Sequence, residues 1–155
     1  MKYSALIFDE KLDHEDSLNY LEEIARILKE DDSCRQIIVS CSQEEMLHLA
    51  KTPIAKAMYV AKLPGKYASL LNALKAVVED DVLIFGLSQS VHSEDIQSLL
   101  KALVDVPAVS LHKDARGFDT RLLMFTLQKA MDEGFDMEDY TDAINQYADF
   151  PIRNL

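Results

Sequence analysis

The chain has 155 residues, of which 48% are hydrophobic and 28% charged, with 4 Gly and 4 Pro. Because it also contains no apolar run of about 18 residues, this composition excludes a membrane-spanning helix and a collagen-like or disordered chain. Lys and Arg number 16 against 27 Asp and Glu, so the formal net charge is -11. That charge repels phosphate backbones and anionic lipids, and we expect neither a nucleic-acid nor a membrane partner.

Five short apolar runs, rich in β-branched and aromatic residues, predict five strands. They cover Tyr3 to Phe8, Gln36 to Ser40, Ala57 to Leu63, Asp81 to Leu87 and Pro107 to Leu111. The runs are continuous rather than alternating, which indicates burial on both faces and is typical of a parallel sheet.

Segments of helical period separate these runs. The first expected helix has an apolar stripe from Leu18 to Leu28, and the second begins at the capping box Ser42 to Glu45. The third has a stripe from Tyr67 to Val78, and the fourth begins at Ser93. The last two cover Thr120 to Glu133 and Met137 to Ala148. This alternation predicts an α/β fold of one domain over residues 1–155. We expect a three-layer sandwich whose mostly parallel sheet has five strands or slightly more.

Ligands of such a sheet bind beyond the carboxyl ends of its strands, so we searched those ends for candidate site residues. Asp9, Glu10 and Asp13 follow the first strand and have the oxygen ligands that Mg2+ or Ca2+ takes, although acids are also common at helix starts. Lys66 follows the third strand in a Pro-Gly-Lys turn, and Lys113 follows the fifth. Either lysine could meet a phosphate.

A phospho-receiver domain is one alternative interpretation. The chain resembles that class in Asp9 and Glu10 after the first strand, Ser88 after the fourth and Lys113 after the fifth. A receiver needs a phospho-accepting Asp at the end of the third strand, where this sequence has Ala61 to Pro64. This alternative is therefore disfavoured.

Several segments, in the same order along the chain, resemble the cytidylyltransferases that make 4-diphosphocytidyl-methylerythritol in isoprenoid synthesis and their ribitol-phosphate relatives. The similar segments are Lys2 to Ile7, Asp32 to Glu45, Ser69 to Leu74, Asp80 to Phe85, Gly117 and Phe118 with Leu122, Leu123 and Gln128 to Ala130, and Glu133 to Phe135 with Thr141 to Ala143. The resemblance implies a nucleotidyltransferase-like, Rossmann-type fold. It also places Ser69 at the serine that reads cytosine, and Lys66 near an arginine of the family's binding loop.

The residues that carry this family's chemistry are replaced here. Asp9 to His14 stand where the family has a Gly-rich triphosphate loop with an Arg and a Lys, and carboxylates there repel a triphosphate. Gly86 to Ser90 stand where it has a metal-binding Asp and a following Arg. The segment before Gly117 is also much shorter than the family's arm. Phosphoryl transfer depends on metal and cationic clamps, so these losses predict an inactive relative.

The sequence therefore predicts a catalytically inactive, cytidylyltransferase-like domain that acts by binding, with no catalytic residue and no cofactor. The net charge favours a basic protein partner. One alternative is a minimal nucleotidyltransferase that uses CTP and Mg2+, with Asp9, Glu10 or Asp13 on the metal and Lys66 or Lys113 on phosphates. Another is a nucleotide sensor that reads the base through Ser69 without turnover.

The cellular compartment is predicted from the cysteines and the N-terminus. Cys34 and Cys41 have neither the spacing of a metal site nor that of a disulfide framework. The first ten residues have too short an apolar stretch for a signal peptide. We therefore expect a cytoplasmic protein.

Overall fold

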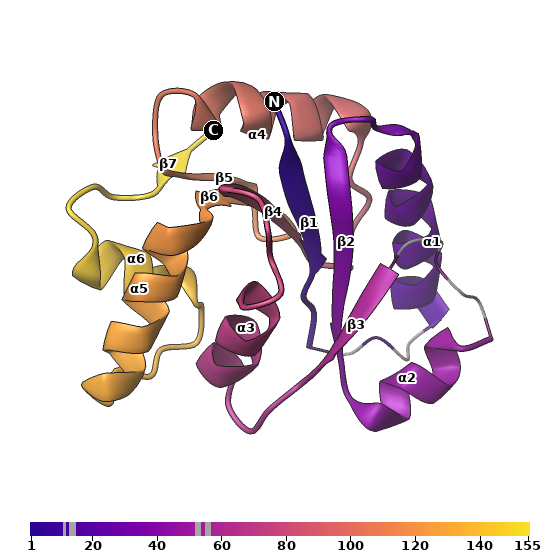
Figure 1. The fold of residues 1–155 in the computed structure, drawn as a ribbon, viewed down its shortest axis with the longest axis horizontal. Coiled ribbons are helices and arrows are strands. Elements are labelled where there is room, and N and C mark those ends of the chain that lie inside the picture. The colour runs from indigo at the N-terminus through magenta and orange to yellow at the C-terminus, as the bar shows by residue number, and fades with distance from the viewer. Residues whose placement is uncertain (11, 13–14, 52–53, 55–56) are drawn as a thin grey trace.

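The structure is a computed structural model that describes residues 1–10, 12, 15–51, 54 and 57–155. In chain order its elements are β1 (Tyr3–Ile7), α1 (Glu15–Glu30), β2 (Cys34–Cys41), α2 (Gln43–Leu49), β3 (Ala57–Ala61), α3 (Lys66–Leu74), β4 (Asp81–Phe85), α4 (Ser93–Leu103), β5 (Ala108–His112), β6 (Ala115–Asp119), α5 (Thr120–Asp132), α6 (Thr141–Tyr147) and β7 (Arg153–Asn154) (Figure 1).

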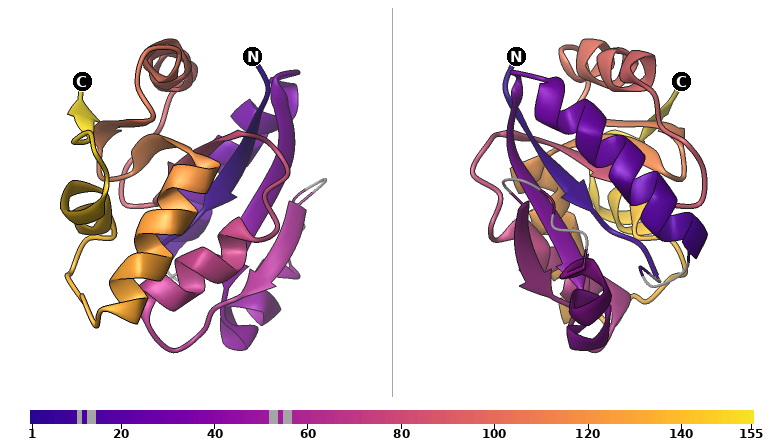
Figure 2. Two further views of the ribbon diagram at one scale, coloured as in Figure 1. Left: turned by 60° about the vertical axis from the view of Figure 1, so that its left-hand side comes forward. Right: turned by 90° about the vertical axis from the view of Figure 1, so that its right-hand side faces the viewer.

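The strands form one sheet in the order β3-β2-β1-β4-β6-β5-β7, with a layer of helices on each face. Helices α1 and α4 cover one face, in front in the right view of Figure 2, and α3 and α5 cover the other, in front in the left view. Each layer buries its own apolar cluster against the sheet. The expected three-layer α/β sandwich is confirmed. Among the described helices, none is long and apolar enough to cross a membrane.

All five predicted strands form, and the pairs among β1, β2, β3 and β4 are parallel, as expected. The sequence prediction missed β6 and the short β7. Strand β6 follows β5 after a turn at Lys113 and Asp114, and it pairs antiparallel with both β4 and β5. The sheet is therefore larger than five strands and mixed at this side.

Strand β6 escaped prediction because its residues do not form an apolar run. Arg116 and Gly117 stand in its middle, yet both are buried. Gly117 is required by packing, because a Cβ built there would lie 2.9 Å from side-chain carbons of both Leu83 and Leu103. Arg116 is tolerated because its charge is paired, as described below.

Two predicted helix boundaries are wrong. Helix α3 ends at Leu74 rather than near Val78, whose side chain is 75% exposed. The last helix begins at Thr141 rather than at Met137. The Asp139 carboxylate accepts hydrogen bonds from the N–H (3.0 Å) and the hydroxyl (2.9 Å) of Thr141, which fixes the start of α6 there.

The predicted capping box at the start of α2 is confirmed. The Ser42 hydroxyl accepts the Glu45 N–H (3.1 Å), and the Glu45 carboxylate accepts the Ser42 N–H (2.8 Å). The same carboxylate accepts the Leu12 N–H (2.7 Å) and pairs with the Lys62 ammonium (2.9 Å). Glu45 thus ties three segments together from a buried position.

We expect Glu45 to make the protein sensitive to acid. Burial alone raises the pKa of this carboxyl, but the hydrogen bonds from Ser42, Lys62 and Leu12 outweigh burial and hold the pKa below its ordinary value. A carboxyl whose pKa is lowered by folding stabilises the protein above its unfolded-state pKa, and that stability is lost as pH falls through the folded-state pKa. The free energy of unfolding should therefore decline below about pH 5.

Urea unfolding of the wild-type chain and of Glu45→Gln at pH 7 and pH 4 measures this contribution. The variant should lose less stability than the wild type over that interval. Glu44→Gln is the matched control, because Glu44 is an exposed neighbour in the same helical turn. Equal losses in the wild type and Glu45→Gln would contradict the assignment.

Candidate functional site

A cavity of about 930 Å³ lies at the carboxyl ends of β1, β3 and β4. The hairpin between β5 and β6 and the segment before α6 complete its wall. The lining residues are Phe8, Asp9, Glu10, Lys62, Leu63, Gly65, Lys66, Ser69, Gly86, Ser88, Lys113, Asp114, Arg116, Met137, Glu138, Asp139, Tyr140 and Asp142. This is the edge of the sheet where the sequence predicted a site.

Five of the six residues predicted for the site line this cavity together. They are Asp9, Glu10, Lys66, Ser69 and Lys113. The sixth, Asp13, lies outside the described residues. The structure thus brings the predicted residues into one place, whereas their roles depend on the contacts that each side chain makes.

The Ser69 hydroxyl is used within the chain. It donates a hydrogen bond to the Leu63 carbonyl (2.7 Å) and accepts one from the Leu63 N–H (2.8 Å). The side chain is 5% exposed, so it closes the turn between β3 and α3. Gly65 allows this turn because its φ of 97° lies in the left-handed region. The donor proton of the Ser69 hydroxyl is thus used within the chain.

The two lysines near the mouth of the cavity also bind the chain itself. The Lys62 ammonium donates to the carbonyl oxygens of Asp9 (2.7 Å) and Glu10 (3.2 Å), in addition to its pair with Glu45. The Lys66 ammonium donates to the carbonyl oxygen of Glu138 on the opposite wall. By contrast, Lys113 makes no hydrogen bond or ion pair with the described residues.

Two carboxylates occupy the turn that follows β4. The Asp9 carboxylate accepts the Leu87 N–H. The Asp114 carboxylate accepts the Ser88 hydroxyl and the Gln89 amide (3.1 Å), and it lies 3.4 Å from the Ser88 nitrogen. Asp114 is only 3% exposed, so these polar partners compensate for the burial of its charge. The backbone donors of this turn therefore face the protein's own acids.

Arg116 forms an ion pair with Asp139 in the cavity wall. Its guanidinium makes two parallel hydrogen bonds to the Asp139 carboxylate, at 3.0 and 2.8 Å, and lies over the Tyr140 ring at 5.2 Å. Burial alone raises the pKa of Asp139, but the bonds from Arg116 and Thr141 outweigh it and lower that pKa overall. Two-pronged Arg–carboxylate pairs are among the stronger charge-assisted contacts in proteins.

Tyr140 closes the floor of the cavity. Its ring packs edge-on against Phe8 and Phe118, with centroids 6.1 and 5.9 Å apart. Burial raises the pKa of its hydroxyl to about 12, so the phenol is neutral at physiological pH. Only 6% of Tyr140 is exposed.

Sequence reasoning did not single out Lys62, Asp114, Arg116 or Asp139. Asp114 could have been found, because it lies two residues after the end of the fifth strand. Arg116 and Asp139 could not, because β6 was not predicted and Asp139 was expected inside a helix. Their pairing depends on contacts between residues 23 positions apart.

The described residues do not fit a Mg2+ site. No group of three or more His, Cys, Asp or Glu side chains in this part of the chain is arranged to hold a metal ion. The buried Asp114 carboxylate is surrounded by hydrogen-bond donors, whereas a metal needs its oxygens. Asp13, the third predicted ligand, lies outside these residues.

No family model matches the sequence. No curated protein matches it either. The fold, however, is similar to that of several solved cytidylyltransferases. The 2-C-methyl-D-erythritol 4-phosphate cytidylyltransferase of Thermus thermophilus superposes with a TM-score of 0.78 at 16% identity, over 100% of this chain and 88% of that one.

Two further solved structures show the same similarity. The 4-diphosphocytidyl-2C-methyl-D-erythritol synthase of Anaerococcus prevotii has a TM-score of 0.76 at 16% identity, over 99% of this chain and 86% of that one. The Francisella tularensis cytidylyltransferase has a TM-score of 0.73 at 13% identity, over 99% and 90% of the two chains. These similarities establish a cytidylyltransferase-like fold, as the sequence resemblance implied.

Proposed function

We propose that this chain is a cytidylyltransferase-like domain that does not catalyse nucleotidyl transfer and acts by binding. One observation carries the proposal: apart from Lys113, the basic side chains that line the cavity already bind acids and carbonyl groups of the chain itself. Arg116 is paired with Asp139, and the Ser88 hydroxyl with Asp114. A triphosphate would have to displace Asp139 and Asp114 before it could bind Arg116 or the Ser88 hydroxyl.

The charge of the residues that line the cavity also disfavours nucleotide binding. Six acids and four basic residues line it, so its net charge is negative if all of them are ionised. Coulomb repulsion therefore opposes the binding of a nucleoside triphosphate. Among the described residues, no group of side chains is arranged to hold a Mg2+ ion that would neutralise the phosphates. Exposed acids at the rim, including Glu10 and Glu138, favour a basic protein partner instead.

Thermal unfolding in the presence of CTP tests the proposal. A ligand that binds the folded state at 100 times its Kd stabilises it by about 2.7 kcal/mol, which shifts the Tm by several degrees. We expect no shift in Tm with millimolar CTP, with or without Mg2+, and no pyrophosphate release in the presence of a polyol phosphate. Turnover would establish the enzyme alternative, and a CTP-dependent shift without turnover would establish the sensor.

A further inference from the structure

Strand β3 is an open edge of the sheet. It stands first in the strand order and, within the described part of the chain, pairs only with β2. In the left view of Figure 2 it forms the outer border of the sheet, and no described helix lies beyond it. Its register with β2 runs without a shift from Ala57 to Ala61. The outer side of β3 therefore has no strand partner among the described residues.

In a parallel strand, successive residues point their backbone N–H and C=O groups to opposite sides, and this alternation identifies the groups of β3 that point away from the sheet. The Lys62 N–H bonds the Cys41 carbonyl on β2 (3.0 Å), so residues 58 and 60 also point their backbone groups toward β2. Residues 57, 59 and 61 then point outward. Two of these groups are used locally, because the Ala57 N–H bonds the Ile54 carbonyl and the Ala61 carbonyl accepts the Asn72 amide. Tyr59 directs both its N–H and its C=O away from the sheet.

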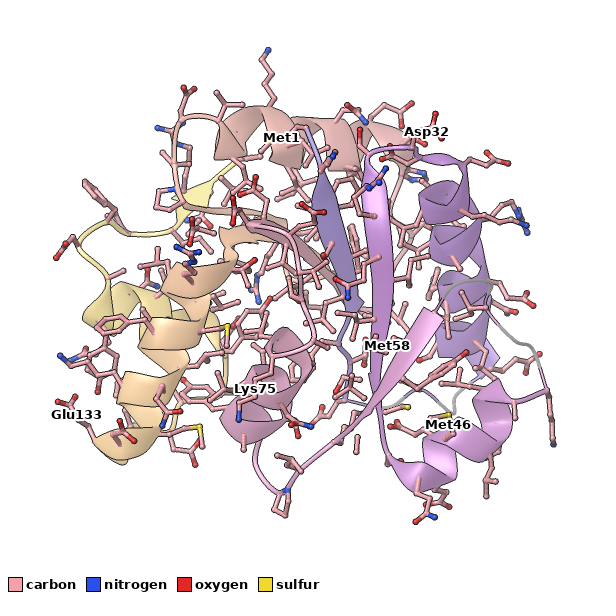
Figure 3. All side chains as sticks on the ribbon, viewed as in Figure 1. Met1, Asp32, Met46, Met58, Lys75 and Glu133 are labelled. Carbon is pink, nitrogen blue, oxygen red and sulfur yellow. The ribbon has the colours of Figure 1, made fainter. Side chains whose placement is uncertain are left out.

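The strand lacks the devices that usually protect an edge. Proteins block open edges with charged side chains, proline or a bulge within the strand. The sequence of β3 is Ala-Met-Tyr-Val-Ala, with none of these. Met58 on the strand, labelled in Figure 3, is 48% exposed, so apolar surface accompanies the outward backbone groups of Tyr59.

The part of the sequence that contains β3 is basic, unlike the chain as a whole. Residues 46–78 contain five lysines and no Asp or Glu, so the rest of the chain carries more than the whole net charge of -11. Lys51 and Lys75 are exposed, whereas Lys66 is bonded to the Glu138 carbonyl and Lys62 is paired with the Glu45 carboxylate. Pairing of two β3 edges would bring lysines together, which disfavours a second copy of the chain as the occupant.

We propose that the β3 edge binds an extended, acidic segment of a partner protein, which adds as a strand to the sheet. Backbone hydrogen bonds to Tyr59 supply affinity and register, and carboxylates of the segment pair with the exposed Lys51 and Lys75. The surface is separate from the acidic rim of the cavity, and it does not depend on whether the cavity binds nucleotide. A single-stranded nucleic acid is the competing occupant, but it offers no backbone amides to the strand.

Fluorescence anisotropy with a labelled eight-residue peptide of alternating Glu and Val tests the proposal. Tyr59→Pro removes the outward N–H while leaving the bonds to β2 intact, and Tyr59→Ala is its control because it removes the side chain but keeps the N–H. We expect Tyr59→Pro to weaken binding about tenfold relative to Tyr59→Ala. Binding should also weaken as salt is raised.

Several outcomes would overturn the proposal. These are no binding of the Glu-Val peptide, equal affinity of the two variants, equal affinity for a Lys-Val peptide, or tighter binding of a single-stranded oligonucleotide. If Tyr59→Pro fails to fold by circular dichroism, the wild-type chain is titrated with the Glu-Val peptide methylated at every backbone amide. That peptide should bind at least about tenfold more weakly, and equal binding would contradict strand addition.

Discussion

Replacing Asp139 by asparagine should raise the affinity of the cavity for inorganic pyrophosphate by about tenfold or more. The carboxylate now holds both terminal nitrogens of the Arg116 guanidinium at 2.8 and 3.0 Å. Asparagine retains an oxygen for Thr141 but removes the charge that neutralises the arginine. Two unit charges about 4 Å apart interact with about 4 kcal/mol at an effective dielectric constant of 20. A strongly screened fraction of this energy is enough to change the affinity for pyrophosphate about tenfold.

Calorimetric titration of pyrophosphate into Asp139→Asn and into Asp142→Asn separates local from general charge effects. Asp142 lines the same cavity, but no hydrogen bond or ion pair joins it to Arg116 among the described residues. Asp142→Asn should therefore raise the affinity much less. Equal gains in the two variants would show that only net charge matters, and no gain in Asp139→Asn would contradict the idea that Asp139 blocks an anion site.

The strands that sequence reasoning found are those whose apolar runs report burial directly. β1, for example, is buried over all five residues from Tyr3 to Ile7. Strand β6 is equally central but has the sequence Ala-Arg-Gly-Phe-Asp. Its burial depends on an ion pair with a distant segment and on a glycine that fits between Leu83 and Leu103. Neither the ion pair nor the fit of the glycine can be predicted from the hydrophobic pattern of the strand's own residues.

The same distinction applies to the candidate site. Residues at strand ends could be predicted to share a cavity, because parallel strands carry their carboxyl ends to one edge. Whether those residues are available to a ligand could not be predicted. Lys66 donates to the Glu138 carbonyl, 72 positions along the chain, and the Ser69 hydroxyl is closed on Leu63. Availability is set by such tertiary contacts rather than by residue type.

Gly86→Ala should destabilise the protein by about 2 kcal/mol, because it forces a methyl group into a filled space. A Cβ built at Gly86 would lie 2.1 Å from a carboxylate oxygen of Asp114 and 3.4 Å from its Cα. Asp114 cannot move aside without loss, since its carboxylate binds Ser88 and Gln89 from a position that is 3% exposed. The glycine after β4 is thus what allows an acid from the β5–β6 hairpin to lie against the strand end.

A double-mutant cycle with Asp114→Ala isolates this clash, measured as free energies of unfolding in urea. Asp114→Ala removes the atoms that the new methyl group would meet, so Gly86→Ala should cost far less in that background than in the wild type. The two costs would be the same if Gly86 were needed only for its backbone conformation. In that case the close approach of Asp114 would be incidental, and the turn after β4 would owe its shape to the glycine alone.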